Sequence, residues 1–406
     1  MDKATILRLA SRHLCPDRVR RFEQWGVDLV IGRRRGYRLW DVDGREFFDL
    51  HLNGGTFNLG HAHPEVLATL REASAALDIG NHHFPSEARA QLAAALAAMT
   101  DGRLPLCVLA PSGSEAIDVA IKSARWATGR RKIVGVEGGY HGRTGLSGAA
   151  GDAATAAFFQ SDRPDEFVTA PFNDLDALRL ALAGGDVAAV LLETIPATLG
   201  FPTPQDGYLQ GVRRLCDDFG ALYSADEVQT GLGRTGRLWG VDAFGAEPDV
   251  LVAGKGLSGG LYPMAATLLS DRAGAWLHED GWAHISTFGG AELGCAVALK
   301  TLEITQRSET VAGVAALSDF FAEGLARLQD ASGPLVEIRQ KGLVIGLKFD
   351  APDGGLRMSK ALYDQGVWAM FAGFDPSVLQ FKPGLLLSLR DAEDILQRLE
   401  RAIRSF

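Results

Sequence analysis

Five short apolar runs recur between residues 106 and 253, and segments with helical periodicity separate them. The runs cover residues 106–109, 132–136, 188–192, 221–225 and 250–253. They are continuously apolar instead of alternating, which is typical of parallel strands that helices cover on both faces. We therefore expect a large, mostly parallel α/β sheet to occupy the middle of this chain.

The two ends of the chain have a different pattern. Residues 37–42 and 46–50 are strand-like and flank Asp43-Gly44, a strong hairpin turn signal. Beyond residue 300, a long helical stretch precedes strand-like residues 344–349, a further helix and the apolar residues 385–387. A closing helix carries Ile395, Leu396, Leu399 and Ile403 on one face. We predict a large α/β domain at 61–300 and a small α+β domain at 301–406, to which the segment 1–60 contributes.

Charge and cysteine usage exclude several classes of protein. The net charge of −9 argues against nucleic-acid binding, which requires a concentrated basic face. The basic clusters 33–35 and 130–132 are interpreted as solvated charge in loops or at helix ends. The four cysteines lack metal-ligand spacing, and no window approaches the roughly 18 apolar residues of a membrane span. We expect a cytoplasmic protein without metal, nucleic acid or membrane as partner.

Two charged residues directly follow apolar runs. Lys255 lies between Gly254 and Gly256, just after 250–253. A lysine with a depressed pKa in a half-buried cleft can attack a carbonyl to form an imine, and flanking glycines let a planar ring approach the backbone. Asp226 ends the run 221–225, where ligands of α/β sheets gather. It could serve as a salt-bridge partner, a metal ligand or a partner for a protonated heteroaromatic nitrogen.

Two glycine-containing segments have competing interpretations. Ser112, Gly113 and Ser114 open a predicted helix, where backbone N–H groups can bind a phosphate. Ser112 and Glu115 also have the spacing of a capping box, and the two roles are compatible. Residues 231–236 spell G-x-G-x-x-G, but no convincing helix follows, so we reject a dinucleotide-binding dehydrogenase.

In combination, these segments resemble those of class-III aminotransferases, which are enzymes dependent on pyridoxal 5′-phosphate (PLP). The matching segments are 58–64 (NLGHAHP), 112–116 (SGSEA), 139–144 (GYHGRT), 226–231 (DEVQTG), 254–256 (GKG) and 286–290 (STFGG). Each is weak alone, but their order and spacing are specific and span nearly the whole chain. The resemblance implies the three-layer, aspartate-aminotransferase-like fold of type I, with PLP in the 61–300 domain.

The resemblance also implies roles for individual residues. Lys255 would hold PLP as a Schiff base and move the substrate's Cα proton, while Asp226 would keep the pyridine nitrogen protonated. Tyr140 and Val228 would cover the two faces of the ring. Thr287 would reach the phosphate of a partner subunit, which implies a homodimer with active sites at its interface. The complete set of implied cofactor contacts is Ser112, Gly113, Ser114, Tyr140, His141, Glu193, Asp226, Val228, Gln229, Lys255, Ser286 and Thr287.

One departure from the family pattern bears on the reaction. Gln380 stands where many members place an arginine that binds a substrate α-carboxylate, and Lys382 lies close to it in sequence. An amide cannot supply the bidentate ion pair of an arginine. We rank transamination of a small primary amine first, with Gln380 and Lys382 as candidate substrate contacts. The alternative is elimination from an amino-alcohol phosphate or a hydroxy-aminophosphonate that lacks an α-carboxylate, because a minority of the family are lyases of this kind.

Overall fold

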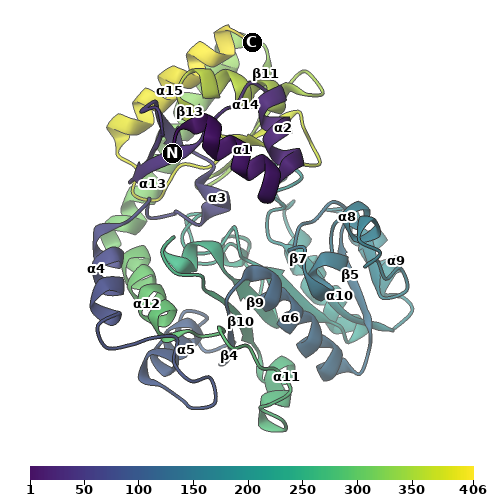
Figure 1. The fold of residues 1–406 in the computed structure, drawn as a ribbon. Helices are drawn as coiled ribbons and strands as arrows, with labels where there is room; N and C mark the ends of the chain where they lie inside the picture. The colour runs from purple at the N-terminus through teal and green to yellow at the C-terminus, as the bar shows by residue number, and fades with distance from the viewer.

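A computed structural model describes the backbone of residues 1–406 and all side chains except those of residues 331 and 332. The chain forms two lobes (Figure 1). One lobe is built around the strands of the middle of the chain, and the other contains both termini. No helix among the described residues has the length and apolar character needed to cross a membrane.

The first lobe contains a seven-stranded sheet in the order β4-β10-β9-β8-β7-β5-β6. Its strands are β4 (Leu106–Ala110), β5 (Lys132–Val136), β6 (Phe167–Ala170), β7 (Val187–Glu193), β8 (Leu222–Asp226), β9 (Val250–Ala253) and β10 (Ala265–Leu269). Only β10 runs antiparallel to its neighbours. All five predicted apolar runs are strands of this sheet, so the mostly parallel α/β architecture is confirmed. Strands β6 and β10 had not been predicted.

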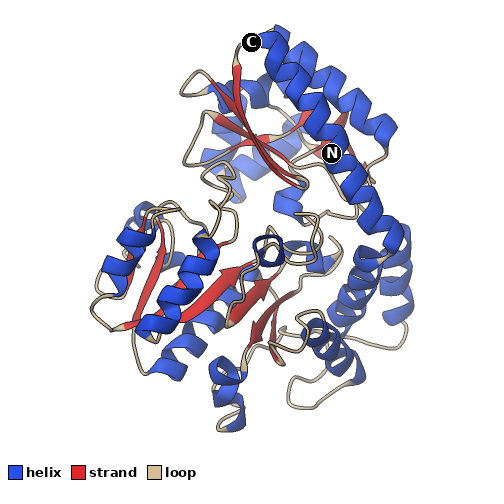
Figure 2. Cartoon of the chain, turned by 180° about the vertical axis from the view of Figure 1, so that it is seen from behind, coloured by secondary structure: helices blue, strands red, loops and turns tan.

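Helices cover both faces of this sheet, which makes three layers (Figure 2). In β9, Val250 and Val252 pack into the cluster formed with α6 (Gly113–Thr128). Leu251 and Ala253 point to the opposite face and pack into the cluster formed with the helices there. Those helices are α5 (Glu87–Ala98), α9 (Leu175–Leu182), α10 (Tyr208–Phe219) and α12 (Glu292–Gln306). Burial on both faces explains why the strands are continuously apolar.

The second lobe joins the two ends of the chain. One sheet has the order β1-β2-β3-β13 and the other β11-β12-β15-β14. The strands are β1 (Ile31–Arg35), β2 (Arg38–Asp41), β3 (Glu46–Asp49), β11 (Leu335–Lys341), β12 (Val344–Phe349), β13 (Val367–Trp368), β14 (Met370–Phe371) and β15 (Val378–Phe381). Phe48 pairs with Val367, so N-terminal and C-terminal residues share a sheet. The boundaries at residues 60 and 300 stay a prediction, and α12 itself crosses residue 300.

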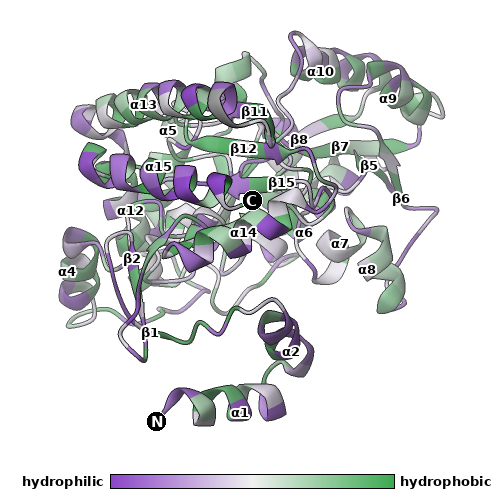
Figure 3. Ribbon diagram, turned by 90° about the horizontal axis from the view of Figure 1, so that it is seen from above, coloured by the Kyte–Doolittle hydropathy of each residue, from purple (hydrophilic) through white to green (hydrophobic). Residues whose placement is uncertain are grey.

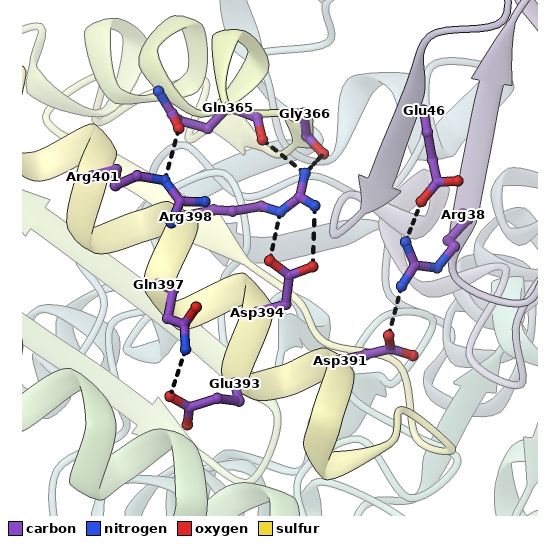
Figure 4. Close-up of polar contacts among 10 residues, drawn as sticks. All are labelled: Arg38, Glu46, Gln365, Gly366, Asp391, Glu393, Asp394, Gln397, Arg398 and Arg401. Atoms are coloured by element: carbon purple, nitrogen blue, oxygen red, sulfur yellow. Dashed lines mark hydrogen bonds and ion pairs between the residues drawn. The ribbon is translucent and has the colours of Figure 1, made fainter.

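Polar contacts of α15 (Leu389–Arg404) fasten the end of the chain to its beginning (Figure 4). Arg38 of β2 forms ion pairs with Glu46 and with Asp391, the latter at 2.7 Å. Arg398 forms a bidentate pair with Asp394 and donates to the carbonyl of Gln365 at 2.9 Å. The predicted inner face of this helix is buried, and its outer face is hydrophilic (Figure 3).

The remaining helices and 3-10 turns are short, apart from the 25-residue helix α13. They are α1 (Lys3–His13), α2 (Pro16–Gln24), α3 (Leu52–Gly55), α4 (Pro64–Ala73), α7 (Gly145–Ala149), α8 (Ala153–Phe158), α11 (Asp271–Gly274), α13 (Ser308–Ser332), α14 (Gly354–Asp364) and the 3-10 turns η1 (Val241–Phe244), η2 (Lys255–Ser258) and η3 (Ala275–His278).

The structure also revises two local interpretations. The basic residues 33–35 are exposed but belong to strand β1, not to a loop or a helix end. The guanidinium of Arg33 lies 3.9 Å from the ring centroid of Trp40, and this contact suits an exposed strand. In the basic cluster 130–132, Arg130 is not a freely solvated charge but donates to the carbonyls of Val187 at 3.1 Å and Phe219 at 2.7 Å, and Lys132 begins strand β5.

Candidate active site

A cavity of about 190 Å³ opens beside the carboxyl ends of β7, β8 and β9. Its lining residues are Gly113, Ser114, Tyr140, His141, Gly142, Glu193, Asp226, Val228, Gln229 and Lys255. Ser112 lines an adjoining cavity together with Gly113 and Lys255. Most of the predicted cofactor contacts, which are far apart in sequence, therefore lie around one small space.

Lys255 begins the turn η2 immediately after β9. Its φ of 40° lies in the left-handed region, which costs a non-glycine residue free energy and is found preferentially at functional sites. Burial lowers the pKa of the Lys255 ammonium, and the charges of Asp226 and Glu193 oppose this effect. A lysine with a lowered pKa supplies more of the neutral amine that acts as a nucleophile or base.

A left-handed turn in α3 covers the side chain of Lys255. Leu52, Asn53, Gly54 and Gly55 all have positive φ, between 48° and 100°. A Cβ atom at Gly54 would lie 2.7 Å from Cε of Lys255, so only glycine fits at this position. This turn was not predicted from the sequence. The available signal was the Asn-Gly-Gly sequence directly after a predicted strand.

The last residue of β8, Asp226, is held in place by two donors. The Nδ1 atom of His141 lies 2.8 Å from Oδ2 of Asp226, and the backbone N–H of Val228 donates to Oδ1 at 3.0 Å. Burial alone would lower the pKa of His141, but the hydrogen bond and charge of Asp226 outweigh burial and raise it. The other ring nitrogen of His141 is buried without a hydrogen-bond partner. The nearby Asp226 side chain therefore favours the protonated form of the His141 ring.

Glu193, the last residue of β7, organises the neighbouring wall of the cavity. Its carboxylate accepts hydrogen bonds from the backbone N–H of Tyr140 at 3.0 Å and of Ala197 at 3.2 Å. Burial and the nearby charge of Asp226 raise the pKa of Glu193 to about 7. The side chain can therefore exchange a proton near neutral pH, and it fixes the backbone of Tyr140.

The N-terminus of α6 closes one end of the cavity. Ser112 is the N-cap residue, and its hydroxyl accepts a hydrogen bond from the backbone N–H of Glu115 at 3.2 Å. Ser114 packs tightly against Gly142, because a Cβ atom built on Gly142 would lie 2.2 Å from Oγ of Ser114. The exposed N–H groups and positive dipole end of this long helix form an anion site. The Ser112 half of the predicted capping box is confirmed, but the Glu115 side chain does not return a hydrogen bond to the Ser112 backbone, and its Oε1 has no hydrogen-bond partner among the described residues.

Ser286 and Thr287 do not join the residues around Lys255. Ser286 lines a different cavity, of about 360 Å³, between the segments 82–83 and 281–289. Thr287 is exposed to solvent. Within one chain, these two residues therefore lie apart from the cavity that Lys255 lines.

Gln380 and Lys382 are buried at the end of β15, and neither lines the cavity. The amide of Gln380 donates to the carbonyl of Ala197 at 2.7 Å. The ammonium of Lys382 donates to Oε1 of Gln380 at 2.6 Å. The backbone N–H of Ala197 in turn donates to the carboxylate of Glu193, which lines the cavity. Gln380 is therefore connected to the cavity wall through the backbone of Ala197.

The fold and this site together define a PLP-dependent enzyme of fold type I. A family model for class-III aminotransferases matches residues 22–403, and the chain belongs to this family. An uncharacterized aminotransferase of Archaeoglobus fulgidus is 46% identical over 99% of this chain and 94% of its own.

Two solved structures share the fold over almost their full length. The ornithine aminotransferase of Toxoplasma gondii, in a structure that reveals partial occupancy of PLP, superposes with a TM-score of 0.91 at 27% identity, covering 100% of this chain and 94% of that one. The N-acetylornithine aminotransferase of Stenotrophomonas maltophilia has a TM-score of 0.81 at 31% identity, covering 96% and 99%.

The cavity fits PLP, the cofactor of this family. It combines a buried amine, a buried carboxylate, an aromatic side chain and a helix N-terminus, which match the aldehyde, ring nitrogen, ring face and phosphate of the cofactor. Two buried polar atoms of the lining, Oε1 of Gln229 and Nε2 of His141, have no partner among the described residues. Such atoms are ordinarily satisfied by a ligand or water.

Proposed function

We propose that this aminotransferase transfers the amino group of a small primary amine, with Lys255 as the residue that holds PLP and moves the proton. The observation that carries this proposal is the placement of Lys255 and Asp226 in one cavity at the ends of adjacent parallel strands. Bound PLP supplies an electron sink for the electron pair released when the substrate's Cα–H bond breaks.

The residues of this chain divide the remaining work. Nζ of Lys255 would hold the cofactor covalently until the substrate amine displaces it. The released Nζ would then take the Cα proton and return it to the cofactor carbon on the other side of the substrate nitrogen. The Asp226 carboxylate, fixed by His141, keeps the ring nitrogen protonated. The lowered pKa of Lys255 favours the neutral amine that the proton transfer requires.

The other lining residues hold the ring. Tyr140 and Val228 would cover the two faces of the ring. Val228 lies close to the phosphate loop, because a Cβ built on Gly113 would be 3.3 Å from Cγ1 of Val228. The loop of Ser112, Gly113 and Ser114 binds the phosphate through backbone N–H groups and hydroxyls. Gln229 and Glu193 lie at the ring hydroxyl, where the unpartnered Oε1 of Gln229 gains a donor.

We further propose that the enzyme is a homodimer in which Ser286 and Thr287 complete the partner's phosphate site. The segments around these residues present large exposed apolar side chains, namely Phe84, Trp282, Ile285 and Phe288. Arg89 ties the two segments together by donating to the carbonyls of Gly290 and Asn81, both at 2.7 Å. An apolar patch on a preformed surface is typical of a subunit interface. The separation of Thr287 from the cavity within one chain supports a contribution in trans.

Elimination is a second candidate because Gln380 offers no guanidinium. Its amide is already bonded to Ala197 and Lys382, so it is not free to bind a substrate α-carboxylate. This arrangement favours an amine without such a group, including amino-alcohol phosphates and aminophosphonates. The named relatives are aminotransferases, and transamination therefore ranks first.

One experiment separates the two reactions. The PLP-loaded protein is mixed with candidate primary amines in the absence of an amino acceptor, and carbonyl product and ammonia are measured. Transamination stops after one equivalent of carbonyl product per site and resumes when an α-keto acid is added. Continuous release of ammonia without an acceptor would instead show elimination.

A further inference from the structure

We propose that His284 is a positioning residue, which holds the loop that carries Thr287 so that Thr287 can reach the phosphate site of the partner subunit. This loop, residues 281–289, is called the Thr287 loop below. The inference rests on the proposed homodimer, and it names the contact within one chain that prepares the loop for the other.

His284 joins the Thr287 loop to helix α6. Nζ of Lys122, on α6, lies 2.8 Å from Nδ1 of His284. On the other side of the imidazole, Nε2 lies 3.9 Å from Oε1 of Glu115, which is beyond hydrogen-bond length. Glu115 and Lys122 are seven residues apart, so they lie on one face of the helix, about two turns from each other. The imidazole of His284 therefore spans this face.

The charges on α6 fix the orientation of the His284 ring. Burial lowers the pKa of His284, the charge of Lys122 adds to this effect, and Glu115 opposes it, so the ring is neutral. Because Nδ1 faces an ammonium, it accepts a hydrogen bond, and the ring proton is on Nε2. The acceptor of the ring thus faces a cation, and its donor lies toward a carboxylate.

The other end of the Thr287 loop is also fixed. Arg89 of α5 donates to the carbonyl of Gly290 at 2.7 Å. Between the two ends, the backbone N–H of Gly289 donates to Oγ of Ser286 at 3.1 Å, and this bond closes a turn around Thr287. Thr287 itself is exposed to solvent and lies three residues from each anchor. Its position is therefore set by the contacts of its neighbours.

Such anchoring matters for a residue that acts across an interface. A hydroxyl that binds a phosphate of another chain contributes most when its loop is ordered before the chains meet, since ordering the loop on binding would cost conformational entropy. The contact between His284 and Lys122 supplies this order within one chain. The phosphate site of the partner therefore depends on helix α6 of this chain.

The test locates the effect of residue 284 with mixed dimers, purified through a different affinity tag on each chain. One chain carries Lys255→Ala, so PLP can be held covalently only by Lys255 of the other chain. In the cis dimer, His284→Leu is on the chain that keeps Lys255. In the trans dimer, His284→Leu is on the chain with Lys255→Ala. The dimers, freed of cofactor, are titrated with PLP and reduced with borohydride, and the PLP trapped on Lys255 is quantified by peptide mass spectrometry.

We expect the trans dimer to need about tenfold more PLP for half-saturation than a mixed dimer with His284 in both chains, because its intact Lys255 faces the altered loop. The cis dimer should match that reference dimer. In the trans position, His284→Asn should restore most of the affinity, since the amide oxygen replaces Nδ1 as the acceptor for Lys122. His278→Leu is the control, because His278 is exposed and precedes the loop, and it should change nothing.

The role of His284 is refuted if both dimers lose affinity equally, or if only the cis dimer does, because His284 would then act on its own chain. It is also refuted if His284→Asn is no better than His284→Leu. Thr287→Ala in the trans position separates this inference from the proposed dimer. A defect with Thr287→Ala but not with His284→Leu refutes the role of His284 alone, whereas no defect with either variant refutes the shared phosphate site as well.

Discussion

Nδ1 of His141 lies 2.8 Å from Oδ2 of Asp226, and both side chains are almost completely buried. The pair joins the segment after β5 to the end of β8, two strands that are not neighbours in the sheet. Together with the backbone N–H of Val228, which donates to the other oxygen, the pair fixes the orientation of the Asp226 carboxylate, which we propose to face the cofactor's ring nitrogen. His141 is therefore a positioning residue in this account.

Replacing His141 with glutamine tests this pairing through pH. The folded pKa of His141 is raised, so its contribution to stability is complete below the unfolded pKa of about 6.5 and is lost as pH rises through the folded value. His141→Gln should therefore lower Tm more at pH 6 than at pH 9, and should move the alkaline limb of the kcat profile. A Tm difference independent of pH would contradict the charged pairing.

Replacing Gly54 with alanine tests the cover over Lys255. The new Cβ would lie 2.7 Å from Cε of Lys255, and the alanine would have to adopt the positive φ of 74° that residue 54 has. We therefore expect strongly reduced cofactor absorbance and a decrease of about 1 kcal/mol or more in the free energy of unfolding. Gly44→Ala is the matched control, because its φ is 91° but no atom lies within 4 Å of the new Cβ. Equal cofactor absorbance in the two variants would show that the clash at Gly54 is unimportant.

Much of this site was predictable because it lies at the ends of regular elements. Asp226 is the last residue of β8, Lys255 directly follows the end of β9, and Ser112 has the spacing of a helix cap. Local sequence patterns encode such features directly. The left-handed turn at 52–55 was not predicted although Asn53-Gly54-Gly55 is a local turn signal, and its place over Lys255, which is distant in sequence, could not be read from that signal.

Two other features depend on long-range pairing. Strand β6 is an edge strand, only partly buried, and β10 runs against the prevailing direction, so neither stands out as a buried parallel strand. The burial of Lys382 was also invisible in sequence, where a lysine at the end of a strand is most often exposed. Its environment arises only when residues 51, 197 and 380 come together.

The interface proposal predicts complementation between inactive chains. Thr287→Arg should block the phosphate site of the partner, and Lys255→Ala should inactivate its own site, so each variant alone is inactive. A mixture refolded together should recover activity, because each mixed dimer contains one intact site, formed by Lys255 of one chain and Thr287 of the other. Activity no greater than that of the separate variants would contradict a contribution of Thr287 in trans.

The apolar patch can be tested independently of activity. Trp282→Asp should shift the protein from dimer to monomer in sedimentation, because it places a charge among exposed apolar side chains. Leu180→Asp is the control, since this residue is also exposed but lies on α9, which packs on β6 at the opposite edge of the large sheet from β4. If both variants remain dimeric, the patch is not the interface.

The central claim is that Lys255 holds the cofactor, and reductive trapping tests it most directly. The PLP-loaded protein is reduced with sodium borohydride, digested, and the labelled lysine is located by peptide mass spectrometry. We expect the label on Lys255 alone in the wild type, and on no lysine in Lys255→Ala. A label on another lysine in the wild type, or an unchanged label in Lys255→Ala, would contradict the account.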